Sequence, residues 1–160
     1  MLGGDGLNKK TIILIAIVLL WMGVIYNYSD KNGKESKLSS DRVIKAVEVV
    51  GKTSLADKKN SKMTDIRYIR LVRKSAHIMS YLILAVLVFM ASYEIKKSIN
   101  KSIWYSFIIS TLYAMSDEYH QYFVPGRSAS IKDVGIDMIG IILGIILIYT
   151  IYKKVKKVNL

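Results

Sequence analysis

The stretch of this chain best suited to chemistry runs from Ser116 to Arg127 and reads SDEYHQYFVPGR. It places two adjacent carboxylates, a histidine, a glutamine and an arginine at the end of one apolar run, shortly before another begins. A charged group at membrane depth costs roughly 3 kcal/mol or more on insertion scales, so such groups usually face a protein interior or a wet cavity. These side chains are therefore the first candidates for function.

A second polar group opens the apolar run of residues 75–93. Arg73, His77 and Tyr81 are spaced four residues apart, so a helix would place them on one face. Lys74 lies beside that face. Simpler roles exist as well: His77 can merely hydrogen-bond a carboxylate, Tyr81 can be a packing residue, and both cations can extend to lipid headgroups.

The stretch Ser116–Arg127 contains a similar pair. Asp117 and Gln121 are four residues apart, and His120 lies alongside. Neighbouring residues point about 100° apart around a helix, so of Asp117 and Glu118 we expect only Asp117 to point inward. Arg127 follows a Pro-Gly turn signal, where it is either a phosphate ligand or the salt-bridge partner of a carboxylate.

The last apolar run, residues 134–152, begins with a pair of aspartates. Asp133 is expected to be the N-cap of this helix, whereas Asp137 lies one turn deeper and is harder to explain as a cap. On the same face, Gly140 and Gly144 form a small-residue stripe that allows another helix to approach closely. The aspartates would then point into a helix bundle.

These residue types limit the chemistry. Carboxylates and histidine perform general acid–base catalysis when their surroundings tune them, and arginine grips phosphate or carboxylate through two parallel hydrogen bonds. The candidate catalytic residues are His77, Asp117 and Glu118, and whether any reaction is catalysed is left open. The candidate ligand-binding residues are Arg73, Lys74, Tyr81, Gln121, Arg127, Asp133 and Asp137. No cofactor and no metal site is expected, because no pair has the histidine spacing of a zinc motif.

Four apolar runs must position these residues. The chain has 160 residues, is 52% hydrophobic and has a positive mean hydropathy. Its apolar residues fall into runs at about residues 11–28, 75–93, 102–119 and 134–152. A helix needs about 20 residues to cross a ~30 Å hydrocarbon layer, and the third run reaches that length only by including Asp117 and Glu118. The sequence predicts a single domain over residues 1–160, an all-α integral membrane protein with four transmembrane helices in an up-down bundle.

The composition also argues against other classes. Lys9 and Lys10 precede the first run as in a signal peptide, but the run is longer than usual for one and no small-residue cleavage site closes it. The net charge of +12 would suit a soluble nucleic-acid-binding protein. Here the basic residues mostly flank apolar runs, where they favour anionic lipid surfaces, so no nucleic acid is expected. The absence of cysteine excludes disulfides and thiolate chemistry.

Four crossings place both termini on one side of the membrane. The basic tail at residues 153–157 and the lysines between the second and third runs predict that this side is cytoplasmic. Residues 29–74 would then be extracytoplasmic, yet they carry 13 Lys and Arg against 6 Asp and Glu, which conflicts with the positive-inside rule. This segment is expected to be partly helical: Ser40 can cap a helix that ends near Gly51, and Thr64 can cap another that leads into the second run.

The same chain order brings the polar ends of the last three runs to one side of the bundle. We therefore expect one polar cavity that opens to the outer leaflet. His77 and Asp117 are expected within hydrogen-bond reach of each other or of a shared water, and Arg127 is expected to fold back over the cluster.

The combined pattern resembles the VanZ-like family of membrane proteins. The matching residues are RKxxHxxxY at 73–81, DExxQxFxPGR at 117–127 and DxxxDxxG at 133–140. The resemblance covers nearly the whole chain, from about residue 11 to residue 152. Members of this family usually carry asparagine where this chain has Asp137, so this chain adds a titratable group there.

The resemblance implies a protein of the bacterial cell envelope, in the plasma membrane of a Gram-positive organism. The founding member of the family is linked to low-level resistance to teicoplanin, a lipoglycopeptide that targets cell-wall precursors, but no agreed reaction accompanies the name. Three functions follow as alternatives: binding of an anionic lipid-linked precursor or a glycopeptide, acid–base or phosphoryl chemistry on such a precursor, and transport or flipping by an oligomer. The expected partners are the lipid bilayer and such a ligand, and the oligomeric state is left open.

Overall fold

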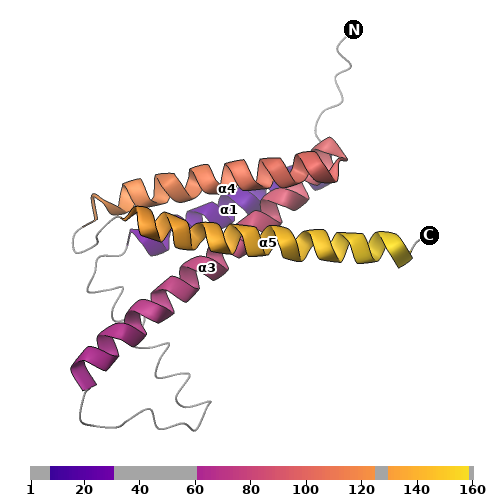
Figure 1. Ribbon diagram of the computed structural model, residues 1–160. Helices are drawn as coiled ribbons and strands as arrows, with labels where there is room; N and C mark the ends of the chain where they lie inside the picture. The colour runs from indigo at the N-terminus through magenta and orange to yellow at the C-terminus, as the bar shows by residue number, and fades with distance from the viewer. Residues whose placement is uncertain (1–7, 31–60, 125–129, 159–160) are drawn as a thin grey trace.

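The computed structural model describes residues 8–30, 61–124 and 130–158, and of 61–70 and 156–158 the backbone alone. These ranges hold four helices: α1 (Lys9–Ser29), α3 (Ser61–Lys96), α4 (Ile99–Gln121) and α5 (Ile131–Val158). Figure 1 shows α1, α4 and α5 running in nearly the same direction, and α3 crossing them so that its first turns project beyond the bundle. The predicted all-α class is confirmed.

Three of the described helices are long and apolar enough to cross a membrane, judged by length and composition: Lys9–Ser29, Leu71–Lys96 and Ile131–Val155. The fourth, α4, has 23 residues and is about 34 Å long, so it has the length of a span. It includes Asp117 and Glu118, as that length requires, and these acids with its buried serines make it more polar than the other three. A crossing by α4 therefore stays a prediction.

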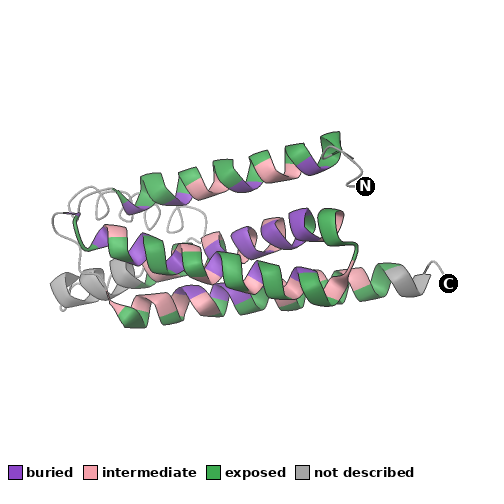
Figure 2. Cartoon of the chain, turned by 90° about the horizontal axis from the view of Figure 1, so that it is seen from above, coloured by how far each residue is buried: buried purple, intermediate pink, exposed green. Residues whose placement is uncertain are grey.

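The helix α1 lies at the edge of the bundle. Its buried positions Thr11, Val18 and Ile25 recur every seven residues, which is the narrow stripe of a helix that contacts its neighbours on one side only. Two bonds tie this stripe to the other helices: Trp21 Nε1 donates to Ser80 O at 3.0 Å, and Tyr113 Oη donates to Met22 O at 2.6 Å. Figure 2 shows that most other buried positions lie where α3, α4 and α5 meet.

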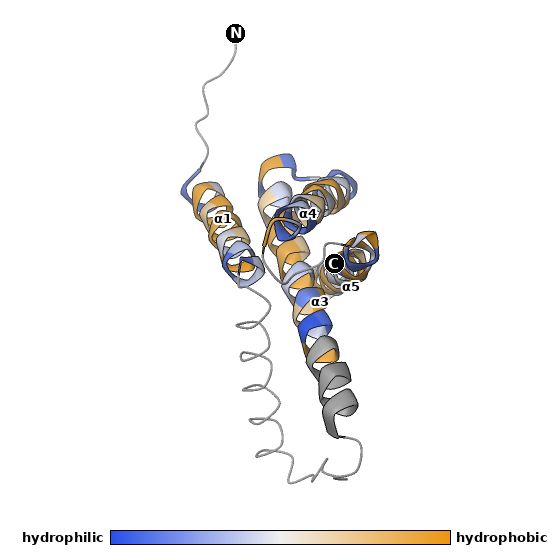
Figure 3. Ribbon diagram, turned by 90° about the vertical axis from the view of Figure 1, so that its left-hand side faces the viewer, coloured by the Kyte–Doolittle hydropathy of each residue, from blue (hydrophilic) through white to orange (hydrophobic). Residues whose placement is uncertain are grey.

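The closest helix crossing in this core is that of α3 and α5. A Cβ added to Gly140 would lie 2.3 Å from Ile78 O, and one added to Gly144 would lie 2.5 Å from Leu82 O. Both distances are too short for any side chain, so only glycine allows the two backbones to touch. This confirms the predicted role of the small-residue stripe. Figure 3, viewed from the end where α5 begins, shows α3 and α5 crossing here.

The helix α4 packs on α3 through small polar residues. Ser102, Ser106 and Ser110 are fully buried and spaced four residues apart, so they line one face of α4. The Ser106 hydroxyl donates to Ala85 O in α3 at 2.7 Å. Short hydroxyl side chains let helices approach and hydrogen-bond across the interface in a membrane, which explains how α4 can pack on α3 with so polar a face.

Opposite the predicted polar cavity, a single carboxylate joins α1 to α3. Glu94 accepts Lys10 Nζ at 2.9 Å, Lys97 Nζ at 2.8 Å and the Asn8 amide at 3.3 Å. Asn8 is also the N-cap of α1, because its side chain accepts from Thr11 N. Lys97 has φ of 49°, and this left-handed residue ends α3 two residues before α4 begins. The end of α3 and both neighbouring helix starts are thereby fixed together.

Two predicted boundaries need correction. The helix α3 begins at Ser61, so Thr64 lies inside it and is not its N-cap. The last helix begins at Ile131 and not near residue 134. The hydropathy pattern marks only the apolar part of a span, whereas polar residues extend both helices beyond it. The helix expected between Ser40 and Gly51 lies outside the described residues.

Candidate functional site

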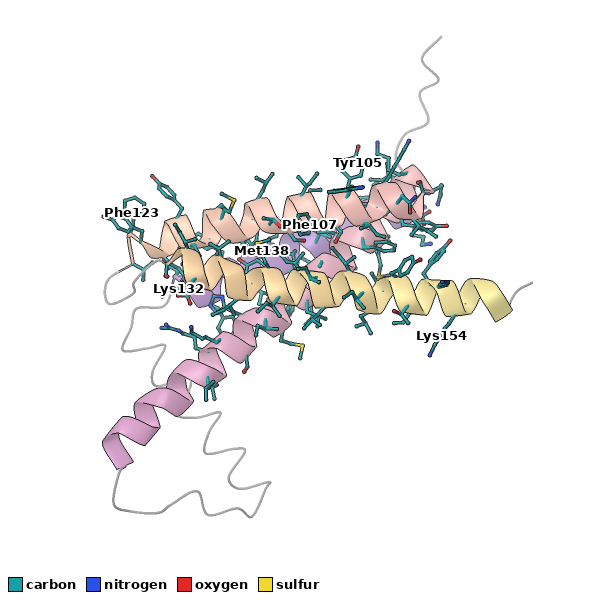
Figure 4. All side chains as sticks on the ribbon, viewed as in Figure 1. Tyr105, Phe107, Phe123, Lys132, Met138 and Lys154 are labelled. Atoms are coloured by element: carbon teal, nitrogen blue, oxygen red, sulfur yellow. The ribbon has the colours of Figure 1, made fainter. Side chains whose placement is uncertain are left out.

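The candidate site lies where α4 ends, α5 begins and the middle of α3 passes. Figure 4 marks this end of the bundle by Phe123, just after α4, and by Lys132, in the first turn of α5. A small pocket here draws its lining from three helices. The lining consists of Arg73, Lys74, His77, Glu118, Gln121, Asp133, Ile136 and Asp137. The sequence-based expectation that these helix ends meet agrees with this placement.

Two lining residues, a histidine and an aspartate, meet across the α3–α5 crossing. His77 Nδ1 lies 3.3 Å from Asp137 Oδ1. The Asp137 side chain is 1% exposed and that of His77 is 20% exposed, so water screens the pair little. The approach depends on Gly140, one turn further along α5, because that glycine brings α5 against the backbone of α3. The carboxylate and the imidazole ring are thereby held in contact.

The second buried aspartate is held from α4 itself. Gln121 Nε2 donates to Asp117 Oδ2 at 3.0 Å, and it also donates to Ser29 Oγ, at the end of α1, at 3.4 Å. Asp117 is 3% exposed. The i, i+4 pairing of Asp117 with Gln121 is thus the one that the sequence predicts, and it links the site to α1 as well.

Tyr81 lies near both aspartates of the site. It is fully buried, and its phenol interacts electrostatically with both Asp117 and Asp137. Its ring lies 6.4 Å from that of His77, nearly parallel to it, and 6.4 Å from that of Tyr113 on α4. His77 and Tyr81 therefore share one face of α3, as their spacing predicts.

Several buried oxygen atoms of this cluster have no hydrogen-bond partner among the described residues. They are Tyr81 Oη, Asp117 Oδ1 and both carboxylate oxygens of Asp137. The His77–Asp137 contact has the distance of an ion pair without the geometry of a hydrogen bond. An unsatisfied buried polar group costs roughly 1–3 kcal/mol, and a charged one costs more. These oxygens therefore offer acceptor positions to a proton, a water molecule or a donor group of a ligand.

Glu118 is buried too, at 5% exposed, which corrects the expectation that only one of the adjacent acids points inward. Its Oε2 accepts the backbone N–H of Ser130 at 3.1 Å and so ties the start of α5 to the end of α4. Asp117 interacts with Tyr81 and accepts from Gln121 on another side of the same helix. Both acids are covered because the end of α4 has neighbours on more than one side.

Asp133 is placed differently from the prediction. The helix α5 begins at Ile131, and Ser130 precedes it with its hydroxyl accepting from Lys132 N at 3.2 Å. Ser130 is therefore the capping residue, and Asp133 lies within the first turn. Its carboxylate is 3.4 Å from Lys74 Nζ, so both groups lie at the rim of the pocket.

The pocket is narrow. Its cavity volume is about 20 Å³, enough for one water molecule or for a single small group of a larger ligand. Cations and acids both line it, with Arg73, Lys74 and His77 on the α3 wall. Any larger ligand must therefore insert one group and lay the remainder over the mouth.

The end of α1 contributes contacts that the sequence analysis did not assign. Ser29 meets Gln121, as described above, and Asp30 Oδ1 lies 3.2 Å from His120 Nε2. The Tyr26 ring lies 4.5 Å from the His120 ring. The order of the helices along the chain could have predicted these contacts, because an up-down arrangement places the end of the first helix beside the end of the third.

Arg127 lies outside the described residues, so its folding back over the cluster stays a prediction.

Within the described residues, no group of three or more His, Asp or Glu is arranged to hold a metal ion. The chemistry to be explained is thus that of acids, an imidazole, a phenol and two cations.

Comparison with models of protein families identifies one match. The VanZ/LLP1 family model matches residues 14–152, which include every described helix except a few terminal residues and the whole candidate site. No curated protein and no solved structure matches the chain significantly. The expected resemblance is confirmed: this chain is a membrane protein of the VanZ type and belongs to the VanZ/LLP1 family.

Proposed function

We propose that the candidate site binds an anionic, lipid-linked cell-wall precursor, or a glycopeptide that resembles one in its charged groups, at the outer leaflet. The supporting observation is that the site combines cationic side chains with buried carboxylate oxygens that lack hydrogen bonds. Arg73 and Lys74 line the pocket together with Asp137, whose carboxylate accepts no hydrogen bond among the described residues. The buried Asp117 also has one oxygen without a hydrogen-bond partner there. A ligand that carries phosphate or carboxylate next to hydroxyl, amide or amine donors would pair with the cations and also donate to the buried oxygens.

The location of the site supports such a ligand. The site lies at one end of a membrane-embedded bundle, so a lipid-linked molecule can reach it while its chain stays in the bilayer. Arg73 can hold a phosphate through two parallel hydrogen bonds, and Lys74 adds a point charge. The narrow cavity suits the insertion of one hydroxyl or amide of the ligand between His77 and the acids.

The proposed orientation has both termini in the cytoplasm of a bacterial cell and the site outside. In its favour, Lys10, Lys97 and Lys101 lie at the end opposite the site, together with the basic end of α5.

The orientation can be tested by labelling single cysteines. The chain has no cysteine of its own, so each single-cysteine variant reports the side of the membrane on which that one residue lies. Lys132→Cys should react with an impermeant maleimide in intact cells, and Lys153→Cys only after permeabilisation. The reverse pattern would place the site in the cytoplasm.

One observation favours an enzyme as the alternative. The buried Asp137 carboxylate lies 3.3 Å from His77 Nδ1, and a small shift into hydrogen-bond geometry would let it support His77 as a general base. The described lining offers acids and an imidazole, so a reaction carried by these residues would be acid–base chemistry on a bound phosphate or sugar. Turnover of a lipid-linked precursor by the purified protein, abolished by His77→Gln, would replace the binding proposal by this one.

The binding proposal is tested by titration of the protein in nanodiscs with a polyprenyl-pyrophosphate-linked sugar and, separately, with teicoplanin. Arg73→Gln should weaken binding of the true ligand roughly tenfold or more, because a charge-assisted hydrogen bond is lost. Lys132→Gln is the matched control, since it removes the same charge from an exposed residue that does not line the pocket. Equal effects of the two substitutions, or saturable binding of neither probe, would refute the proposal.

A further inference from the structure

A second groove lies beside the turn between α3 and α4, at the opposite end of the bundle. It is open, has a volume of about 390 Å³, and is lined by Lys96, Lys101, Trp104, Tyr105 and Ile108. Figure 4 shows Tyr105 at this end, opposite Phe123 and Lys132. None of its lining residues in the described part of the chain is acidic, whereas the candidate site contains several acids.

The positive charge of this groove is not neutralised by its nearest described acid. Glu94 is already bonded to Lys10, Lys97 and Asn8. Lys96 and Lys101 are exposed, and Lys96 Nζ lies 5.3 Å above the centre of the Tyr105 ring. The aromatic face therefore positions one ammonium group at the rim without cancelling its charge.

The floor and the rim of the groove differ in character. Trp104 is 65% exposed and Tyr105 is 42% exposed, which suits aromatic residues at the boundary between hydrocarbon and headgroups. Ile108 continues the same face one turn deeper into α4. The first turn of α4 contains no acidic residue, and its cap position makes no side-chain bond, so its backbone N–H groups add to the attraction for an anion.

We propose that this groove binds an anionic phospholipid such as phosphatidylglycerol. The phosphate lies between the ammonium groups of Lys96 and Lys101, and one acyl chain runs along Trp104 and Ile108. The sequence of basic, aromatic and apolar surface from rim to floor matches headgroup, glycerol and chain of a phospholipid, and the absence of acid favours anionic over zwitterionic headgroups. This lipid site is separate from the candidate site and does not depend on the proposed function.

Trp104 is a natural reporter for the test. The chain has two tryptophans, so a Trp21→Phe protein leaves Trp104 alone in the groove. This protein is reconstituted with either brominated phosphatidylglycerol or brominated phosphatidylcholine at equal mole fraction, and the quenching of Trp104 is compared. The anionic lipid should occupy the groove preferentially, by roughly fivefold for each lysine that it contacts. Equal quenching by the two lipids would overturn the proposal.

Two double variants distinguish specific binding of the lipid in the groove from nonspecific attraction of anionic lipid to a basic surface. Lys96→Gln with Lys101→Gln should reduce the preference for the anionic lipid to near one. Lys153→Gln with Lys154→Gln removes the same charge from the end of α5 and should leave the preference unchanged. An equal loss in both double variants, or no loss in the first, would contradict a site in the groove. Soluble glycerol phosphate should not reverse the quenching, and displacement by it would show that the groove recognises free phosphate and not the lipid.

Discussion

The two ends of the bundle match their carboxylates with partners to very different degrees. At one end, Glu94 meets two lysines and an asparagine amide, so its charge is fully matched. At the other end, Asp117 and Asp137 are more deeply buried and retain oxygens without a hydrogen-bond partner among the described residues. Folding alone explains the first arrangement, because it ties helices together. The second costs stability, and such a cost is typical of a site kept for a ligand or a reaction.

The largest expected effect comes from neutralising Asp117. Asp117→Asn keeps the shape of the side chain and its contact with Gln121 but removes a base and an anion. We expect it to abolish protection against teicoplanin in a susceptible Gram-positive host, with the protein level in the membrane unchanged. Glu94→Gln is the matched control at the other end and should preserve protection. Full protection by both variants would refute a chemical role for the cluster.

Arg127→Ala should have the next largest effect. If this arginine pairs with an acid of the cluster, its removal leaves a buried charge uncompensated, at a cost of roughly 3–5 kcal/mol. The thermal midpoint of the protein in detergent should fall, and protection should fall with it. Loss of protection at an unchanged midpoint would instead make Arg127 a ligand contact and would refute its structural role.

The α3–α5 crossing, which positions His77 against Asp137, can be loosened directly. Gly140→Ala would press a methyl group against Ile78 O and should destabilise the protein by about 1–3 kcal/mol. Gly135 lies on the same helix with nothing within 4 Å of an added Cβ, so Gly135→Ala should be neutral or slightly stabilising. Chemical or thermal unfolding in detergent checks both, and equal stability of the two variants would contradict the close crossing.

The smallest predicted effect separates binding from catalysis. His77→Gln retains hydrogen bonding but not proton exchange or positive charge. If the site binds a ligand, protection should weaken without disappearing, because Arg73 and Lys74 remain in the pocket. Complete loss of protection, with the protein still folded and present in the membrane, would favour the acid–base enzyme.

The sequence predicted the place of the candidate site better than its internal pairing. Helical spacing and chain order suffice to bring His77, Asp117 and Asp137 to one end, and the glycine stripe specifies the close approach of α5. The observed partner of His77 is Asp137, and Asp117 is held by Gln121. Such pairings depend on the rotation and depth of each helix, which are fixed by packing between helices and not by spacing within one.

The burial of Glu118 was missed for a related reason. A periodic pattern shows one buried face, whereas the end of α4 is covered on two sides, by the start of α5 and by α1 with α3. The predicted crossing by α4 is weakly encoded in the sequence as well. Its serines are buried by neighbouring helices, so its polar composition hides a helix as long as the others.

The contrast between the two ends is tested most directly by thermal unfolding with and without the polyprenyl-pyrophosphate-linked sugar. A ligand that binds only the folded state raises the midpoint in proportion to its occupancy. Glu94→Gln should lower the midpoint of the free protein but keep the rise caused by the ligand. Asp117→Asn should keep the midpoint of the free protein and lose that rise. The opposite pattern, a ligand-dependent rise that survives Asp117→Asn and disappears in Glu94→Gln, would contradict the assignment of binding to the acidic end.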